Sequence, residues 1–171
     1  RKDNLKARLA YSTVSQLSYI IVGALLATGA GVVGGAMHIA MHAFGKITLF
    51  FCAGAIMVAA HKTEISEMRG LGRQMPITMT AFLIGAISII GLPPCGGTWS
   101  KWYLMIGAID THHWLIMATL MLSSLLNIAY LLPIPLRAFL STDGVEKDRS
   151  FQLKEAPLPC LLAIGVTALG C

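Results

Sequence analysis

Charged residues are scarce in this sequence. Asp, Glu, Lys and Arg make up 12% of the 171 residues, hydrophobic residues make up 56%, and the mean hydropathy is +0.71. Soluble domains carry about 25% charged residues, so the composition argues against a soluble protein. Long apolar runs separated by short polar breaks indicate that the chain is solvated by a lipid bilayer. The sequence therefore predicts an all-α integral membrane protein.

Metal-ligand and cofactor patterns are also missing. The four cysteines have no metal-type spacing and are expected to be small buried residues without a disulfide framework: Cys52, Cys95, Cys160 and Cys171. No ligand set for a flavin, haem or iron–sulfur cluster is present, so we expect no cofactor and no metal. The net charge of +5 comes from basic residues in the polar breaks, where membrane topology explains it better than nucleic-acid binding.

Apolar segments at residues 9–29, 31–60, 114–140 and 158–171 are candidate crossings. The region 77–109 is interrupted by GLPPCGG, in which two prolines remove backbone donors and glycines add freedom. This region is either two crossings or one crossing made of a broken helix. Without an initiator methionine or a signal-like start, the chain is interpreted as an internal piece of a longer polypeptide.

The distribution of basic residues favours the broken helix. With one crossing, the polar segments 1–8, 62–73 and 137–154 lie on one side and hold eleven of the thirteen Lys and Arg residues. With two crossings, the count becomes seven against four. Because basic loops stay in the cytoplasm, we predict about five crossings, the third discontinuous, with the basic loops cytoplasmic.

The two remaining basic residues, Lys46 and Lys101, fall inside predicted crossings. A charge at bilayer depth costs about 2.5–3.5 kcal/mol or more, so each is a candidate functional residue. His38, His42 and Lys46 recur every four residues and line one stripe of a helix, about 6 Å apart at each step. Imidazole can accept a proton at one nitrogen and donate from the other. The stripe is predicted to relay protons, as in an ion transporter and not an enzyme.

Other interpretations of these residues stay open. Lys46 could extend to the membrane surface, although it lies far from either end of its segment, and the histidines could simply bond neighbouring helices. HIAMH has the histidine spacing of a zinc site but lacks the adjacent glutamate, and paired haem histidines normally come from different helices. Lys101 follows the break, where free backbone groups commonly line ion sites, but it could also be an interfacial lysine between Trp99 and Trp102.

Polar side chains recur along the neighbouring segments. Each of two segments has a predicted polar face: Ser12, Ser15 and Tyr19 in the first, and Ser123, Asn127 and Tyr130 in the fourth. Such residues usually hydrogen bond between helices. They are also candidates for lining a water path beside Lys46.

A family likeness rests on four stretches: LKARLAYSTVSQLSYI, HIAMHAFGKITLFFCAGAI, MRGLGRQMP and FLIGAISIIGLPPCGGTWSKWYL. In this order they resemble the antiporter-like proton-conducting membrane subunits of complex I, membrane-bound hydrogenases and Mrp-type cation/proton antiporters, and most closely the D-type Mrp subunit. The resemblance implies a parent of about fourteen helices with two inverted five-helix repeats. Residues 1–171 would form most of the second repeat and the start of a final helix, in a bacterial plasma membrane.

The resemblance also implies roles for individual residues. Lys46 resembles the central proton-carrying lysine of the second half-channel, with His38 and His42 beside it. Lys101 resembles the ionisable residue of the broken helix, near the outer exit. Lys6 matches the lysine of a DLKR-like motif and is a candidate for proton uptake at the cytoplasmic end.

Two positions depart from the family pattern. Cys95 stands where the PPF-type segment has phenylalanine, and Gly97-Thr98 stands where the family has Gly-Phe. Both changes make the break smaller and more polar than is usual.

The implied function is proton translocation in a multi-subunit monovalent cation/proton antiporter. Its expected partners are protons, sodium or another monovalent cation, other membrane subunits and the lipid bilayer, but no nucleic acid. Two alternatives stay open, namely the same module in a redox-driven pump and a non-conducting scaffold. A scaffold has no use for the costly charges of Lys46 and Lys101.

Overall fold

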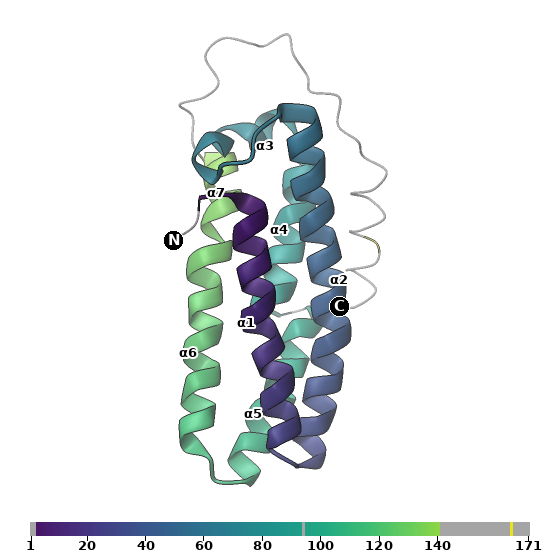
Figure 1. The fold of residues 1–171 in the computed structure, drawn as a ribbon, viewed down its shortest axis with the longest axis vertical. Helices are drawn as coiled ribbons and strands as arrows, with labels where there is room; N and C mark the ends of the chain where they lie inside the picture. Colours follow the sequence, from purple (N-terminus) through teal and green to yellow (C-terminus); the bar gives the residue numbers. More distant parts are fainter. Residues whose placement is uncertain (1–2, 94, 141–164, 166–171) are drawn as a thin grey trace.

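The computed structural model of the chain describes residues 3–93, 95–140 and 165. The regular elements in this part of the chain are helices: α1 (Leu5–Leu25), α2 (Gly29–Ala60), the 3-10 helix η1 (Ile65–Met68), α3 (Leu71–Gln74), α4 (Pro76–Ile90), α5 (Gly96–Asp110), α6 (Trp114–Leu131) and α7 (Pro133–Leu140). The long helices run side by side along an elongated bundle (Figure 1). The prediction of an all-α fold is confirmed.

Helix α1 begins earlier than its apolar segment suggests. The Asn4 side chain accepts a hydrogen bond from the Ala7 amide at 3.1 Å, which satisfies one of the free donors at the helix start. The Leu5 amide donates to the Thr63 carbonyl at 3.0 Å. The start of α1 therefore lies beside the segment that follows α2, and the two helices run antiparallel.

The third crossing is a broken helix, as predicted. Helices α4 and α5 contain 15 residues each, whereas a crossing needs about 20. They lie end to end beside α2 in Figure 1, so together they make one passage along the bundle. The break begins at Gly91, whose φ of 82° is accessible to glycine at little cost and ends α4.

The fourth crossing is interrupted near its end. The sequence predicts one segment at 114–140, and the structure divides it into α6 and α7 at Leu132, directly before Pro133. Proline removes a backbone donor and restricts the residue before it, which explains the interruption. The expected fifth crossing at 158–171 lies outside the described residues, apart from Gly165.

Helix α2 packs against α1, α4 and α5, and glycines allow the close approach. A Cβ atom on Gly34 would meet the Leu104 amide nitrogen at 2.8 Å, and one on Gly23 would meet the Gly31 carbonyl at 2.7 Å. Small residues commonly serve in this way where membrane helices meet. The backbones are thus near enough for side chains of α1, α2 and α5 to share one interior.

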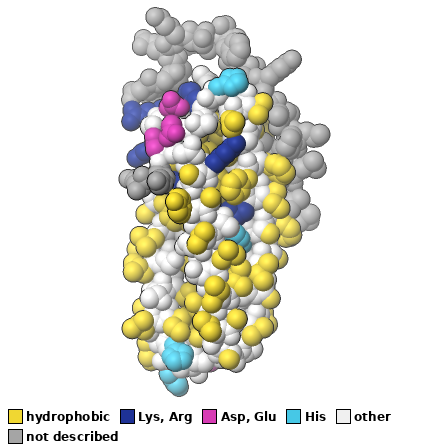
Figure 2. All heavy atoms as spheres, in the orientation of Figure 1, with side chains coloured by type: hydrophobic (Ala, Val, Ile, Leu, Met, Phe, Trp, Pro, Cys, Tyr) yellow, Lys and Arg dark blue, Asp and Glu magenta, His cyan; other side chains and the backbone are white. Residues whose placement is uncertain are grey.

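The surface separates polar and apolar regions along the bundle. On the face in Figure 2, Lys, Arg, Asp and Glu lie in the part of the molecule toward α3, and hydrophobic side chains cover the remaining length. Among the exposed apolar side chains of α6, Leu115 is 79% exposed and Leu125 is 62% exposed. Helices α2 and α6–α7 are long and apolar enough to cross a membrane. This surface suits a lipid environment.

Candidate functional site

Lys46 lies near the middle of α2 and is turned into the bundle. Its side chain is 5% exposed, and its ammonium donates a hydrogen bond to the Leu9 carbonyl of α1 at 2.9 Å. The acidic residues that flank Lys46 in the sequence are Asp3, shortly before α1 begins, and Glu64, after α2 ends. In the described residues, Lys46 is held by a carbonyl dipole, and its ammonium makes no ion pair with a carboxylate.

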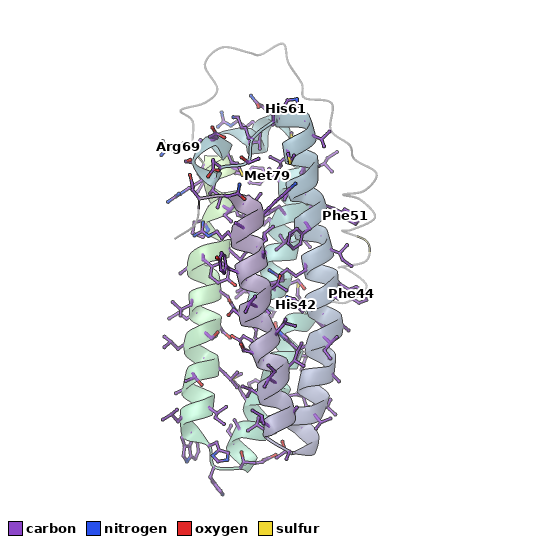
Figure 3. All side chains as sticks on the ribbon, in the orientation of Figure 1. His42, Phe44, Phe51, His61, Arg69 and Met79 are labelled. Atoms are coloured by element: carbon purple, nitrogen blue, oxygen red, sulfur yellow. The ribbon has the colours of Figure 1, made fainter. Side chains whose placement is uncertain are left out.

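His42 and His38 continue the stripe from Lys46 along α2. Their ring centroids are 6.0 Å apart and the rings are nearly parallel, with an interplanar angle of 19°. Figure 3 places His42 about midway along the bundle, and His61 and Arg69 toward the end that holds α3. The His42 Nε2 atom is buried and has no hydrogen-bond partner in the described structure. The stripe therefore has an unused donor or acceptor at its centre.

His38 connects three helices. Its Nε2 atom lies 3.0 Å from Gln16 Oε1 of α1, and its Nδ1 atom lies 3.1 Å from Ser100 Oγ of α5. The Ser100 hydroxyl in turn donates to the Gly97 carbonyl at 3.0 Å. The chain of hydrogen bonds therefore leads from α1, through a ring on α2, to the first turn of α5.

Lys101 of α5 hydrogen bonds across the break to the end of α4. Its ammonium donates to the Ile90 carbonyl at 2.6 Å and to the Ile89 carbonyl at 3.2 Å, and the side chain is 7% exposed. These carbonyls end α4 and have no partner further along that helix. Trp99 and Trp102, by contrast, are 57% and 55% exposed. Lys101 thus points inward to the break while its tryptophan neighbours face outward.

Tyr19 of α1 brings Lys101 and His38 together. Its ring stacks on the His38 ring with centroids 5.2 Å apart. The Lys101 ammonium lies 5.3 Å from the centroid of the Tyr19 ring, within the range of a cation–π interaction. The four residues predicted to relay protons, which come from α2 and α5, therefore lie near one another inside the bundle. His38, Lys46 and Lys101 are buried and His42 is half-buried.

The other candidate lining residues divide into inward and outward positions. Ser12 Oγ lies 2.7 Å from the Tyr130 hydroxyl, which donates to Asn127 Oδ1 at 2.7 Å, so α1 and α6 are joined. Ser123 is half-buried, and its neighbour Ser124 is the serine within 3.5 Å of the Tyr19 hydroxyl.

The predicted shared face of α1 is wrong at Ser15. Ser12 and Tyr19 are buried, whereas Ser15 is exposed. At 100° per residue, Ser15 is turned about 60° from Ser12 toward the outside, so it is unsuited to lining an interior path.

Lys6 lies apart from the buried residues. It is exposed near the start of α1, and its ammonium lies 3.0 Å from Met57 Sδ near the end of α2. The structure therefore places it at the polar end of the bundle and gives it no direct hydrogen bond to the stripe.

Gln16 and Ser100 are central to the site, yet the sequence did not single them out. Gln16 is fully buried and is the one amide in the segment 9–29, four residues after Ser12. A strongly polar side chain inside a crossing is costly, and that signal could have identified it. Ser100 carries a weaker signal, because serines are common where helices pack.

The described residues contain no group of three or more His, Cys, Asp or Glu side chains suited to a metal ion. The buried histidines instead contact an amide, a hydroxyl and aromatic rings. These groups fit the binding and transfer of protons better than they fit a resident metal or cofactor.

A helical bundle with a broken crossing and buried lysines defines a class of membrane proteins in which ionisable groups line the interior. The chain belongs to the family described as "NADH:quinone oxidoreductase/Mrp antiporter, TM", which matches residues 1–127.

Curated relatives include membrane components of two kinds of complex. The N-type NADH-quinone oxidoreductase subunit of Desulforudis audaxviator is 39% identical over 177 residues, covering 95% of this chain and 35% of that protein. The D-type Na(+)/H(+) antiporter subunit of Alkalihalophilus pseudofirmus is 29% identical over 167 residues, covering 97% of this chain and 34% of that protein. The chain thus spans about a third of the length of these relatives.

Solved structures support the fold. A chain of the Mrp complex from Dietzia sp. DQ12-45-1b superposes with a TM-score of 0.79 at 25% identity, covering 95% of this chain and 39% of that chain. A chain of respiratory complex I from Thermus thermophilus gives a TM-score of 0.53 at 21% identity, covering 94% of this chain and 42% of that chain. The resemblance to the antiporter-like family is confirmed.

Proposed function

We propose that this chain is the C-terminal part of a proton-conducting transporter domain, in a subunit of a multi-subunit monovalent cation/proton antiporter. The observation that carries the proposal is the buried alignment of Lys46, His42, His38 and Lys101 across α2 and α5. Each group can bind and release a proton. His38, His42 and Lys46 are one helical turn apart, and His38 and Lys101 both lie against the Tyr19 ring. The cost of burying two lysines is expected only where their protons are used.

Protons would move along this path by exchange between side chains and water. Lys46 would take up a proton from the side of the basic loops, and His42 and His38 would pass it toward α5. Lys101 would release it at the broken helix. Sodium or another monovalent cation would be the exchanged ion, and other membrane subunits would complete its path.

The same module in a redox-driven proton pump is the second candidate. It is favoured by the 39% identity to an NADH-quinone oxidoreductase subunit, whereas the TM-score of 0.79 to a chain of an Mrp complex favours the antiporter. Purifying the full-length protein with its partners separates the two. Small antiporter subunits support the first candidate, and iron–sulfur or quinone-reactive subunits support the second.

Substitution of Lys46 tests proton conduction in both settings. In the complete complex in lipid vesicles, Lys46→Ala should lower proton-coupled transport about a hundredfold or more, the range seen when a positioned acid–base group is lost. Lys46→Arg should lower proton-coupled transport by a similar factor, because the guanidinium group keeps its proton. A pH-sensitive dye inside the vesicles measures the transport.

Lys62→Arg is the matched control, since this lysine lies in the polar segment after α2 and should tolerate arginine. Normal transport with Lys46→Arg would contradict the relay. Normal transport with Lys46→Ala as well would favour the non-conducting scaffold.

A further inference from the structure

The hydrogen bonds around His38 require a specific placement of protons. The Ser100 hydroxyl has one hydrogen, which it donates to the Gly97 carbonyl at 3.0 Å. Its oxygen must therefore accept the hydrogen bond of 3.1 Å from His38, so Nδ1 carries a proton. This leaves Nε2 as the nitrogen whose protonation can change.

The partner of Nε2 is the Gln16 side chain. Gln16 Oε1, an acceptor, lies 3.0 Å from His38 Nε2. That arrangement suits a ring that carries protons on both nitrogens. For a neutral ring, two lone pairs would face each other, and the amide nitrogen of Gln16 would be the suitable partner. Rotation about the last side-chain bond exchanges the oxygen and nitrogen of an amide in nearly the same space.

The Gln16 amide lies between His38 and the Tyr130 hydroxyl. Gln16 is fully buried, and its Nε2 atom has no hydrogen-bond partner in the described structure. The side chain also interacts with the Tyr130 hydroxyl on α6. Turning the amide therefore exchanges the end that faces His38 and the end that faces Tyr130.

Several titratable groups surround His38. Titratable groups face it from three helices, namely Tyr19 of α1, His42 of α2 and Lys101 of α5, and α4 carries none. The Lys101 ammonium lies against the same Tyr19 ring as His38, so a second positive charge on His38 and the charge on Lys101 would repel each other. The neutral ring then needs a hydrogen-bond donor.

We propose that Gln16 is a positioning residue whose amide turns over with the protonation state of His38. The amide accepts a hydrogen bond from the doubly protonated ring and donates one to the neutral ring. Both states of the relay histidine keep all their ring nitrogens paired, so neither proton uptake nor release leaves a buried group unsatisfied. The inference rests on the proposed relay and adds a residue of α1 to it.

Two substitutions separate the functions of the amide. Glutamate at this position, when ionised, is an acceptor only, whereas methionine fills a similar volume and neither donates nor accepts strongly. Gln16→Glu should raise the doubly protonated share of His38 about tenfold, because an ionised carboxylate beside the ring adds a full opposite charge that favours the charged form. Gln16→Met should make that share undetectable. Both variants should slow transport.

Nitrogen NMR of histidine-labelled, full-length protein in lipid bilayers measures the protonation of His38 directly at neutral pH. A difference spectrum against the His38→Gln variant assigns the signal. Gln74→Met is the matched control, because Gln74 ends α3 in the polar part of the bundle and its loss should leave the His38 signal unchanged. Unchanged His38 signals in both Gln16 variants would overturn the inference.

The spectral result is independent of the proposed function. If Lys46→Ala conducts normally while the Gln16 variants shift the His38 signal, the relay is wrong and the amide still controls the ring. If Lys46→Ala is inactive while the His38 signal does not respond to Gln16, the relay stands and this inference fails.

Discussion

At the scale of single residues, each buried lysine is held by backbone carbonyls, and within the part of the chain that the structure describes neither is paired with a carboxylate. Lys46 uses the Leu9 carbonyl near the start of α1, and Lys101 uses the two carbonyls that end α4. A carboxylate partner would fix the charge of an ammonium, whereas a carbonyl dipole stabilises it less strongly. These carbonyl partners therefore suit the proposed relay, in which both lysines would change their charge.

Substitution of Lys101 distinguishes a titrating residue from an anchor. Lys101→Arg should block transport, because arginine can bond the Ile89 and Ile90 carbonyls but cannot release its proton. Lys101→Glu should keep part of the transport, since a protonated carboxyl can donate to one carbonyl and can also lose its proton. A pH-gradient assay on vesicles containing the complete complex measures both variants.

Lys101→Met is the control for that experiment, with a side chain of similar length and no titration, and it should be inactive. Wild-type transport for Lys101→Arg together with an inactive Lys101→Glu variant would show that this lysine only anchors the helix.

At the scale of elements, the break between α4 and α5 depends on a small residue. A Cβ atom on Gly97 would collide with the Ser88 carbonyl of α4, which is backbone and cannot turn aside. Gly97→Ala should therefore push α5 away from α4, displace Lys101 from the Ile90 carbonyl and lower transport about tenfold or more, as small misplacements of reacting groups do.

Gly54→Ala is the matched control, because a Cβ atom there meets no other heavy atom within 4 Å. Its helix should also become slightly more stable, since alanine is the better helix former. The thermal unfolding temperature and the transport rate of the two variants, measured side by side, check the prediction. Equal behaviour of the two variants would mean that the break tolerates a wider packing distance.

The sequence predicted elements better than it predicted contacts. The prolines and glycines of the break, together with the distribution of basic residues, were sufficient to predict the broken third crossing. Proline and glycine act on the local backbone, and basic residues determine which side of the membrane a loop lies on. The helical spacing of His38, His42 and Lys46 was likewise sufficient to predict that they lie on one face of α2. The facing of α1 and α6 depends on tertiary packing, so Ser15 was placed wrongly and Gln16 was overlooked.

At the scale of the whole molecule, the described crossings alternate in direction and bring the basic segments to one end. Lys6, Lys62 and Arg73 belong to that end, whereas the turn between α5 and α6 holds His112 and His113 at the other (Figure 1). In a background without the native cysteines, Glu67→Cys should react with an impermeant label from the cytoplasmic side. His112→Cys should react from outside only.

Both positions are exposed, so access to the label reports sidedness and not burial. Permeabilised cells serve as the control, because both cysteines should then react. Labelling of the two positions from the same side would contradict a single broken crossing.

The length of the His38–Lys46 stripe along α2 has an electrical consequence. Lys46 and His38 are eight residues apart, which corresponds to about 12 Å along a helix and about 40% of a hydrocarbon core of about 30 Å. A full crossing by one charge is worth about 2.3 kcal/mol per 100 mV, so transfer between these two residues would be worth about 0.9 kcal/mol. A proton moving along the stripe would thus travel through a large part of the membrane field. The transmembrane voltage would then bias how often Lys46 and His38 are occupied, and the current through the protein would depend on voltage even at equal pH on both sides.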